Sequence, residues 1–268
     1  MSSMLSVKNI TKAFNKGTPN EKVALDNLSF ELQDGDFVTM LGSNGAGKST
    51  FFNAILGAFF VDSGSIELDG RNITYLKDYK RARDIGCLFQ NPLRGTAPNM
   101  TIEENLSLAY CRKASRSFFA VNKKDCAYFR ELLATLDLGL EDRMKTKIGL
   151  LSGGQRQAVS LLMATISTPK LLLLDEHTAA LDPQTAEKVL AITKEIVERD
   201  KISTMMITHN INSALAYGNR TIMMDEGHII LDIKGQERAD MTVPKLLEYY
   251  SKESHKELAN DRMLFNKE

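Results

Sequence analysis

The sequence has no excess of charge of either sign. Its 268 residues include 34 lysines and arginines and 34 aspartates and glutamates, which cancel. A protein that binds nucleic acid through bulk electrostatics needs a basic surplus, so this balance argues against nucleic acid as a partner. The most basic local cluster contains Lys77, Lys80, Arg81 and Arg83 but is interrupted by aspartates, and we expect it to be the solvated face of a helix.

Cysteines are scarce. Cys87, Cys111 and Cys126 are odd in number, widely spaced and without the paired spacing of metal ligands. They fit buried free thiols in a reducing compartment better than disulfides or a metal site.

Long apolar runs are also missing. A helix that crosses a bilayer needs about 20 predominantly apolar residues, and the longest candidates, 54–61 and 171–174, are far shorter. Residues 1–8 lack the basic and apolar regions of a signal peptide. We therefore expect a soluble chain in the cytoplasm.

What the chain does contain is a series of strand-like and helix-like segments. Short alternating or wholly apolar runs predict strands at 4–10, 28–32, 37–41, 65–68, 85–89, 171–174 and 204–207. Helical patterns lie at 48–58, 101–110 and 185–199, with two or three more before 166 and a charged, helix-prone stretch from 243. Segments 221–225 and 228–231 flank Glu226-Gly227 as a hairpin. The order predicts an α/β core interrupted by a helical insertion at about 91–166.

One glycine-rich segment between a predicted strand and a predicted helix fits the phosphate-loop pattern. It reads Gly42-Ser43-Asn44-Gly45-Ala46-Gly47-Lys48-Ser49-Thr50. Its glycines allow backbone amides to wrap phosphates at a helix N-terminus, Lys48 is expected to reach the terminal phosphates, and Ser49 to bind Mg²⁺. An accidental glycine-rich turn is the alternative, but a chance match is on the order of 1%.

Polar side chains follow three of the predicted strands. Asp175 and Glu176 end the apolar run at 171–174, where ligands of open α/β sheets bind. We expect Asp175 in the magnesium shell and Glu176 to orient or deprotonate the attacking water. Gln90 is expected to bind magnesium or hold that water, and His209 to contact the γ-phosphate; the alternative is that all four are ordinary polar residues at strand ends. His177, His228 and His255 are interpreted as structural or exposed.

A second glycine-rich turn opens with a serine and leads into a helix. It reads Leu151-Ser152-Gly153-Gly154-Gln155 and supplies another phosphate-facing surface. One chain cannot easily fold both surfaces onto one nucleotide, so the sequence suggests a site shared between two copies.

Together these motifs resemble the ATP-binding subunit of ABC transporters over residues 4–235, in that family's order. The resemblance implies an α/β fold: a P-loop NTPase core with a mixed sheet, an N-terminal antiparallel β subdomain and a helical subdomain that carries the family's signature, which is the glycine-rich turn at 151–155. It implies an ATPase domain at 1–240 with the helical subdomain inserted at about 91–166, and a helical C-terminal tail at 241–268. Phe14 takes the place of the aromatic that stacks on adenine.

The resemblance also implies ATP and Mg²⁺ as ligands and a head-to-tail homodimer. Ser152, Gly153, Gly154 and Gln155 of one copy then complete the ATP site of the other, with Ser152 and Gly154 at the γ-phosphate. The insertion and the Gln90 segment are expected to dock a membrane permease, which holds the chain at the cytoplasmic face of the membrane. An extracytoplasmic solute-binding protein is a further expected partner, acting through the permease.

The sequence departs from the family pattern at two positions. His177 stands where proline is usual after the catalytic glutamate, and Ala179 where serine is usual. Because Glu176 and His209 are present, we still expect hydrolysis. An importer ATPase for amino acids or similar small solutes is the leading hypothesis; the alternatives are an exporter ATPase, a soluble ABC ATPase acting in assembly, repair or translation, and a regulator that binds ATP without hydrolysing it.

Overall fold

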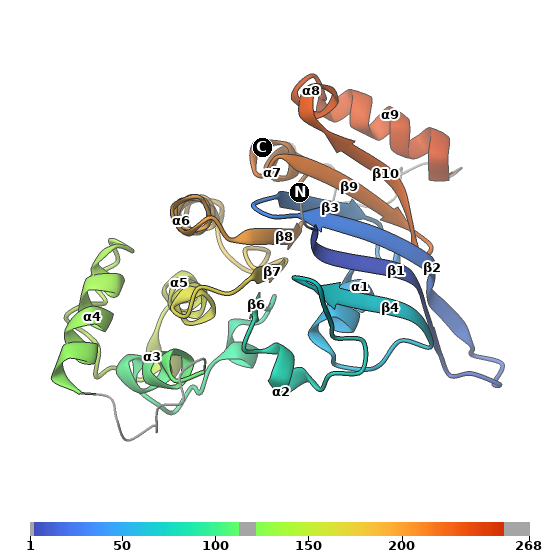
Figure 1. Ribbon diagram of the computed structural model, residues 1–268. Helices are drawn as coiled ribbons and strands as arrows, with labels where there is room; N and C mark the ends of the chain where they lie inside the picture. The colour runs from blue at the N-terminus through green and yellow to red at the C-terminus, as the bar shows by residue number, and fades with distance from the viewer. Residues whose placement is uncertain (1–2, 113–121, 255–268) are drawn as a thin grey trace. The chain divides into compact units, whose positions relative to one another are not determined.

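The computed structural model describes residues 3–112 and 122–254, which form two compact units (Figure 1). One unit contains the described residues up to Arg81 and those from Ser203 onward, and the other runs from Ala82 to Ile202. His255 and the rest of the predicted tail lie outside the described residues.

The first unit is built from two stretches of the chain, and its described residues form thirteen strands and helices. Its elements are β1 (Ser3–Phe14), β2 (Lys22–Gln33), β3 (Phe37–Gly42), α1 (Lys48–Leu56), β4 (Ser63–Leu68), β5 (Arg71–Asn72), α2 (Asp78–Arg81), β8 (Ser203–Ile207), α7 (Ile211–Ala216), β9 (Arg220–Asp225), β10 (His228–Lys234), α8 (Gly235–Ala239) and α9 (Val243–Ser254).

Two sheets organise this unit. Strands β2, β1, β4 and β5 form an antiparallel sheet in that order. Strands β10, β9, β3 and β8 also lie in order, with β3 parallel to both of its neighbours and β9 antiparallel to β10. The run 37–41 is wholly buried, as expected for a strand covered on both faces. The predicted α/β class with a mixed sheet and an N-terminal antiparallel sheet is confirmed.

The C-terminal helices cover part of the mixed sheet. Leu246 and Tyr250 of α9 share an apolar cluster with Ile233 of β10, Met223 of β9 and Leu41 of β3. Figure 1 shows α9 lying along β10. The charged stretch that begins at 243 is therefore a helix, as predicted, with one face in the core.

The helix that follows the phosphate loop packs against the antiparallel sheet. Phe51 of α1 meets Phe30 of β2 edge to face, with ring centroids 5.9 Å apart. Gly57, with φ of 79°, ends this helix as its C-cap, in agreement with the predicted stop. Apolar contacts made by later residues of α1 therefore fix the position of its N-terminus.

Arg81 also contacts the end of α1. The prediction of a solvated basic face is wrong for this residue, although Lys77, Lys80 and Arg83 are exposed as expected. The Arg81 side chain is only 2% exposed. The guanidinium donates to the carbonyl oxygens of Ala54 and Ile55 in the last turn of α1, at 2.7 and 2.8 Å, and to those of Thr74 and Leu76. Burial lowers its pKa to about 10, which leaves it charged at neutral pH.

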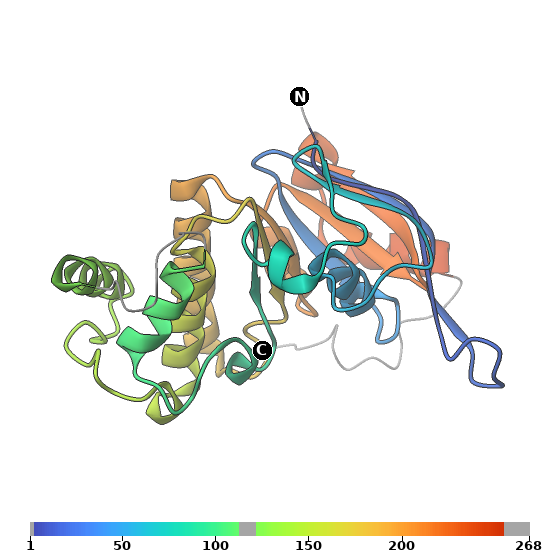
Figure 2. The ribbon, with the colours of Figure 1, turned by 60° about the horizontal axis from the view of Figure 1, so that its bottom comes forward.

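The second unit is dominated by helices around a pair of parallel strands. Its elements are β6 (Ile85–Leu88), the 3₁₀ turns η1 (Pro92–Gly95) and η3 (Ile148–Leu150), α3 (Ile102–Tyr110), α4 (Lys123–Ala134), α5 (Gly153–Thr165), β7 (Leu171–Asp175) and α6 (Pro183–Asp200). The predicted capping box is confirmed, because Thr101 and Glu104 bond reciprocally at the start of α3. Figure 2 shows α3, α5 and α6 as neighbours, and α5 contacts both of the others.

Within residues 3–112 and 122–254, no helix has both the length and the apolar character required to cross a membrane.

Replacing Arg81 with leucine is expected to lower the free energy of unfolding by about 3 kcal/mol, because several buried carbonyl oxygens lose a charged donor. Urea unfolding of the full chain measures the change. Arg83→Ala, at an exposed position nearby, is the control and should shift the midpoint little. Equal shifts for the two variants would contradict the capping role of Arg81.

Candidate nucleotide-binding site

The phosphate loop depends on glycine where neighbouring backbone comes too close for a side chain. A Cβ on Gly42 would lie 2.3 Å from the carbonyl oxygen of Met224, and one on Gly47 would lie 2.6 Å from that of Ala24. Gly47 also has φ of 103°, in the left-handed region that favours glycine. The loop is therefore fitted against β9 and β2, which come from opposite ends of this unit's sequence.

The predicted phosphate-binding groups converge at the start of α1. Gly47 is the N-cap of that helix and makes no side-chain cap hydrogen bond to the first-turn amides. The Lys48 ammonium lies back across the loop and donates to the carbonyl oxygens of Gly42 and Ser43, at 2.7 and 2.9 Å. Ser49 is exposed at the same helix end. Amides, a lysine and a hydroxyl at a helix N-terminus fit a polyphosphate chain.

The β9–β10 hairpin supports the loop from outside, a role that the sequence did not reveal. The Gly227 amide donates to the carbonyl oxygen of Ala46 at 2.9 Å, and Ser43 Oγ donates to Asp225 at 3.4 Å. The sequence predicted a hairpin at Glu226-Gly227, but it did not predict that this turn contacts the phosphate loop. The only signal in the sequence was the tight turn itself.

Phe14, at the end of β1, belongs to an aromatic and charged cluster. Its ring meets that of Phe59 edge to face at 5.4 Å, and the Lys12 ammonium lies 5.6 Å from its centroid. Lys12 also pairs with Asp62, whose pKa is lowered to about 2 by the Ala13 backbone N–H and by its neighbouring lysines. The ring is half exposed, which leaves surface on which a base can stack.

His209 belongs to the same unit as the phosphate loop. It follows β8, whose Ile207 is paired with Met40 of β3, and the Thr208 amide donates to the Met40 carbonyl oxygen. Since β3 runs directly into Gly42, parallel pairing brings His209 to the carboxyl edge from which the loop departs.

The second unit brings Gln90 and Glu176 together. Strands β6 and β7 are parallel, with Leu88 opposite Leu174, so both carboxyl ends lie at one edge. Gln90 Nε2 donates to a Glu176 carboxylate oxygen at 3.3 Å. Asp175 closes β7 immediately before Glu176. A carboxylate held by an amide at a strand end is suited to orienting a water molecule.

Glu176 has an unusual backbone, and its neighbour His177 is buried. Glu176 has φ of 46°, and Ala179 N donates to its carbonyl oxygen at 3.0 Å. His177 is 3% exposed and lies 3.4 Å from the Thr193 hydroxyl of α6. Burial lowers the pKa of this histidine to about 4, so it is neutral at neutral pH. His177 was expected to be either structural or exposed, and its burial shows that it is structural. His228 is half exposed and lies near Asp26.

The signature segment forms the N-terminus of α5. Ser152 is the N-cap: its hydroxyl accepts the Gln155 N–H, and the Gln155 side chain accepts the Ser152 N–H. Arg156 donates to the carbonyl oxygens of Gly149 and Leu151 and so holds the segment that leads into the cap. Ser152 and Gly153 are exposed at this positive helix end.

Gly154 lies inside the packing of α5 against α6. A Cβ here would come within 2.1 Å of Thr185 Cγ2, and one on Gly153 within 3.2 Å of the Leu181 side chain. Gly154 therefore sets the approach of the two helices, and its contact with a phosphate stays a prediction. Asp182 caps α6 by accepting the Thr185 N–H at 3.0 Å, and Thr185 lowers the pKa of Asp182.

The residues predicted to bind magnesium each carry an oxygen donor, which suits Mg²⁺ better than a transition metal. Ser49, Gln90 and Asp175 offer hydroxyl, amide and carboxylate oxygens, and Mg²⁺ favours few protein oxygens combined with phosphate and water. No cluster of three or more histidine, cysteine, aspartate or glutamate side chains suited to a metal occurs among the described residues.

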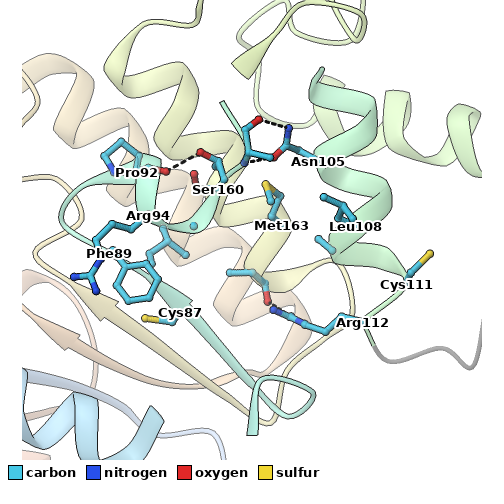
Figure 3. A pocket seen from close by; sticks show the side chains of 16 residues that line it. Cys87, Phe89, Pro92, Arg94, Asn105, Leu108, Cys111, Arg112, Ser160 and Met163 are labelled. Carbon is cyan, nitrogen blue, oxygen red and sulfur yellow. Dashed lines mark hydrogen bonds between the residues drawn. The ribbon is translucent and has the colours of Figure 1, made fainter. Parts of the chain in front are cut away.

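A pocket of about 680 Å³ adjoins the Gln90 segment within the second unit (Figure 3). It lies among the residues after β6, helix α3 and helix α5, and was not anticipated from the sequence. Its lining includes Cys87, Phe89, Arg94, Leu108, Arg112 and Met163.

The pocket combines an apolar wall with two cations. Leu108 is 43% exposed, and Arg94 stacks on Phe89 with 4.9 Å between the guanidinium carbon and the ring centroid. Arg112 donates to the Ala164 carbonyl oxygen. Burial, followed by the charge of Asp175, raises the pKa of Cys87 to about 12, so this thiol stays protonated. All three cysteines are free thiols, as expected. Each is half-buried, whereas the sequence predicted buried thiols.

Lys48→Ala is expected to weaken ATP binding by about tenfold to a hundredfold, because a charge-assisted contact with the phosphates is lost. Titration with a fluorescent ATP analogue measures the dissociation constant. Lys8→Ala, on an exposed position of β1, serves as the control. An unchanged dissociation constant for the Lys48 variant would remove this lysine from the site.

Comparisons with known proteins agree with the motifs. Residues 25–179 match the family model described as ABC transporter. A tyrosine transport ATP-binding protein of Clostridioides difficile (strain R20291) is 42% identical over 247 residues, which cover 92% of this chain and 98% of that protein. The phosphonates import ATP-binding protein PhnC of Halobacterium salinarum is 34% identical over 233 residues, covering 86% and 78%.

Solved structures give the same result. A dimeric post-hydrolysis state of the ATP-binding cassette MJ0796, bound to ADP and Pi, superposes with a TM-score of 0.76 at 30% identity and covers 86% of this chain and 98% of that one. The ADP conformation of MJ1267, an ATP-binding cassette of an ABC transporter, has a TM-score of 0.74 at 26% identity, with coverage of 93% and 99%.

Proposed function

The chain belongs to the ABC transporter family, and on this basis we propose that two copies enclose ATP between them and drive a membrane permease. As a member of that family it is an ATP-hydrolysing subunit of a transporter. We assign the ATPase domain to 1–240, with the helical insertion at about 91–166 and a helical tail at 241–268.

One observation carries the proposal: a single chain presents two separate helix N-termini suited to phosphate. The first is α1, behind the glycine loop and Lys48. The second is α5, whose N-cap Ser152 is exposed. The relative MJ0796, with ADP and Pi bound, is dimeric, which supports sharing of these two surfaces between copies.

ATP binding begins in the first unit. The adenine stacks on Phe14, and the phosphates lie over the loop amides at the start of α1. Lys48 then exchanges its two carbonyl partners, Gly42 and Ser43, for phosphate oxygens. Because those carbonyl bonds already draw its ammonium across the loop, little rearrangement is needed before it meets the phosphates.

Hydrolysis depends on the carboxylate of Glu176, which accepts a proton from the attacking water or orients it. Gln90, bonded to Glu176, directs that carboxylate and could hold the same water molecule. When bound, magnesium would neutralise charge at the phosphates, and Ser49, Gln90 and Asp175 would hold it. His209 donates to the γ-phosphate and so distinguishes ATP from ADP.

ATP binding and hydrolysis drive the permease by changing the relative populations of the open and closed dimer. ATP contacts both copies only when they are closed, so it binds the closed dimer preferentially and favours closure. Cleavage of the γ-phosphate removes the contacts made by Ser152 and His209, and the dimer opens again.

The pocket beside Gln90 is the proposed docking site for a helix of the permease. Its exposed apolar wall at Leu108 and its volume suit one turn of an inserted helix. The pocket is lined by the segment that follows Gln90 and by α5, whose N-cap is Ser152. Movement of Gln90 or of Ser152 would therefore reach the docked helix. This arrangement holds the chain at the cytoplasmic face of the membrane.

The direction of transport is proposed to be inward, for amino acids or similar small solutes. The two relatives named above are a tyrosine transport protein and a phosphonates import protein. An extracytoplasmic solute-binding protein would then deliver the cargo to the permease.

Glu176→Gln is expected to lower ATP hydrolysis at least about a hundredfold, because the general base is lost while ATP still binds. The variant should also accumulate as a dimer at millimolar ATP, measured by size-exclusion chromatography with light scattering. Glu187→Gln on α6 is the control and should hydrolyse ATP like the parent. A Glu176 variant that stays monomeric would overturn the shared site.

Leu108→Glu is expected to abolish recovery of a membrane permease with the tagged chain while basal ATP hydrolysis stays close to that of the parent. A carboxylate in the apolar wall must be desolvated when a helix docks. The readout is mass spectrometry of proteins that co-purify from detergent-solubilised native membranes. Tyr79→Glu, at an exposed site in the other unit, should leave recovery unchanged. Undiminished recovery with the Leu108 variant would place docking elsewhere.

A further inference from the structure

His177 connects the turn that carries Glu176 to helix α6. The imidazole is nearly inaccessible to solvent, and its Nε2 lies 3.4 Å from Thr193 Oγ1. Thr193 is itself buried, on the same side of α6 as the apolar stripe of Val189, Ile192 and Ile196. The contact therefore joins the residue after the catalytic carboxylate to the interior face of an 18-residue helix.

The direction of this hydrogen bond follows from the threonine. Thr193 has one hydroxyl proton, and it donates that proton to the carbonyl oxygen of Val189 at 2.8 Å. The hydroxyl oxygen can then only accept from His177. The imidazole is therefore the neutral tautomer that carries its proton on Nε2.

The turn needs support because Glu176 adopts a left-handed backbone, with φ of 46°. For a residue with a long side chain this conformation costs about 1–3 kcal/mol and persists only where neighbours determine it. On one side Asp175 belongs to β7, whose preceding leucines are wholly buried. On the other side, His177 supplies the link to α6.

We propose that His177 is a positioning residue for ATP hydrolysis: by donating to Thr193 it holds the left-handed turn that aims Glu176 at the water beside Gln90. The inference rests on the catalytic role of Glu176 proposed above. Loosening the link leaves the phosphate loop untouched, because the loop is built by other elements. Loss of this hydrogen bond should therefore lower the turnover rate of ATP hydrolysis and leave the affinity for ATP unchanged.

Paired substitutions test the link in the full chain. His177→Ala and Thr193→Val should each lower kcat about tenfold, while KM for ATP and the dissociation constant of a fluorescent ATP analogue stay within about twofold. His177→Gln, which keeps an N–H donor near the Nε2 position, and Thr193→Ser, which keeps the hydroxyl, should restore most of kcat. The double variant His177→Ala/Thr193→Val should lose no more than either single variant.

Two controls separate this proposal from a loss of stability and from a wrong assignment of Glu176. Ile196→Val removes one methyl group from the same face of α6 and should leave kcat unchanged at a comparable melting temperature. Parental kcat in His177→Ala and Thr193→Val, or losses that add in the double variant, would overturn the positioning role. Parental hydrolysis by Glu176→Gln would instead overturn the catalytic assignment, whatever the His177 variants do.

Discussion

The close approach of distant backbone to the phosphate loop is the constraint on which the nucleotide site depends. Carbonyl groups of β9 and β2 occupy the space in which side chains at Gly42 and Gly47 would lie. The amide of Gly227 completes the enclosure by bonding to Ala46. The loop is thus shaped by the tertiary fold, and its amides are directed before any ligand arrives. Preorganised donors of this kind need little rearrangement when charge develops on a phosphate.

In the second unit, close packing between helices positions the candidate site residues. α6 touches α5 through Gly154 and Thr185, and it touches the turn after β7 through Thr193 and His177. One rigid helix therefore contacts both the base of the signature helix and the residue beside Glu176. A displacement of α6 would therefore reach both the helix that follows Ser152 and the turn that carries Glu176.

Much of the fold was readable because its signals are local. The capping pair Thr101 and Glu104, the glycine that ends α1 and the Glu226-Gly227 turn each act within a few residues. The candidate site residues were recognised from sequence motifs, and the structure brings two of them, Gln90 and Glu176, together. Arg81 was misread because two of its carbonyl partners lie on α1, 27 and 26 residues earlier, and alternating charges around it suggested solvent. The pocket and the support of the loop by Gly227 were hidden for the same reason: neither exists until distant segments meet.

The capping box at Ser152 limits which amino acids suit the signature position. Serine, threonine, aspartate and asparagine all cap helices well, because each offers an oxygen to the N3 amide. A hydroxyl that accepts from Gln155 still carries its own proton, which it can donate to a phosphate oxygen. An aspartate in its place would cap equally well but would bring a negative charge towards the nucleotide. Helix stability alone therefore does not select serine here; the preference for a hydroxyl arises when the cap must also face an anion.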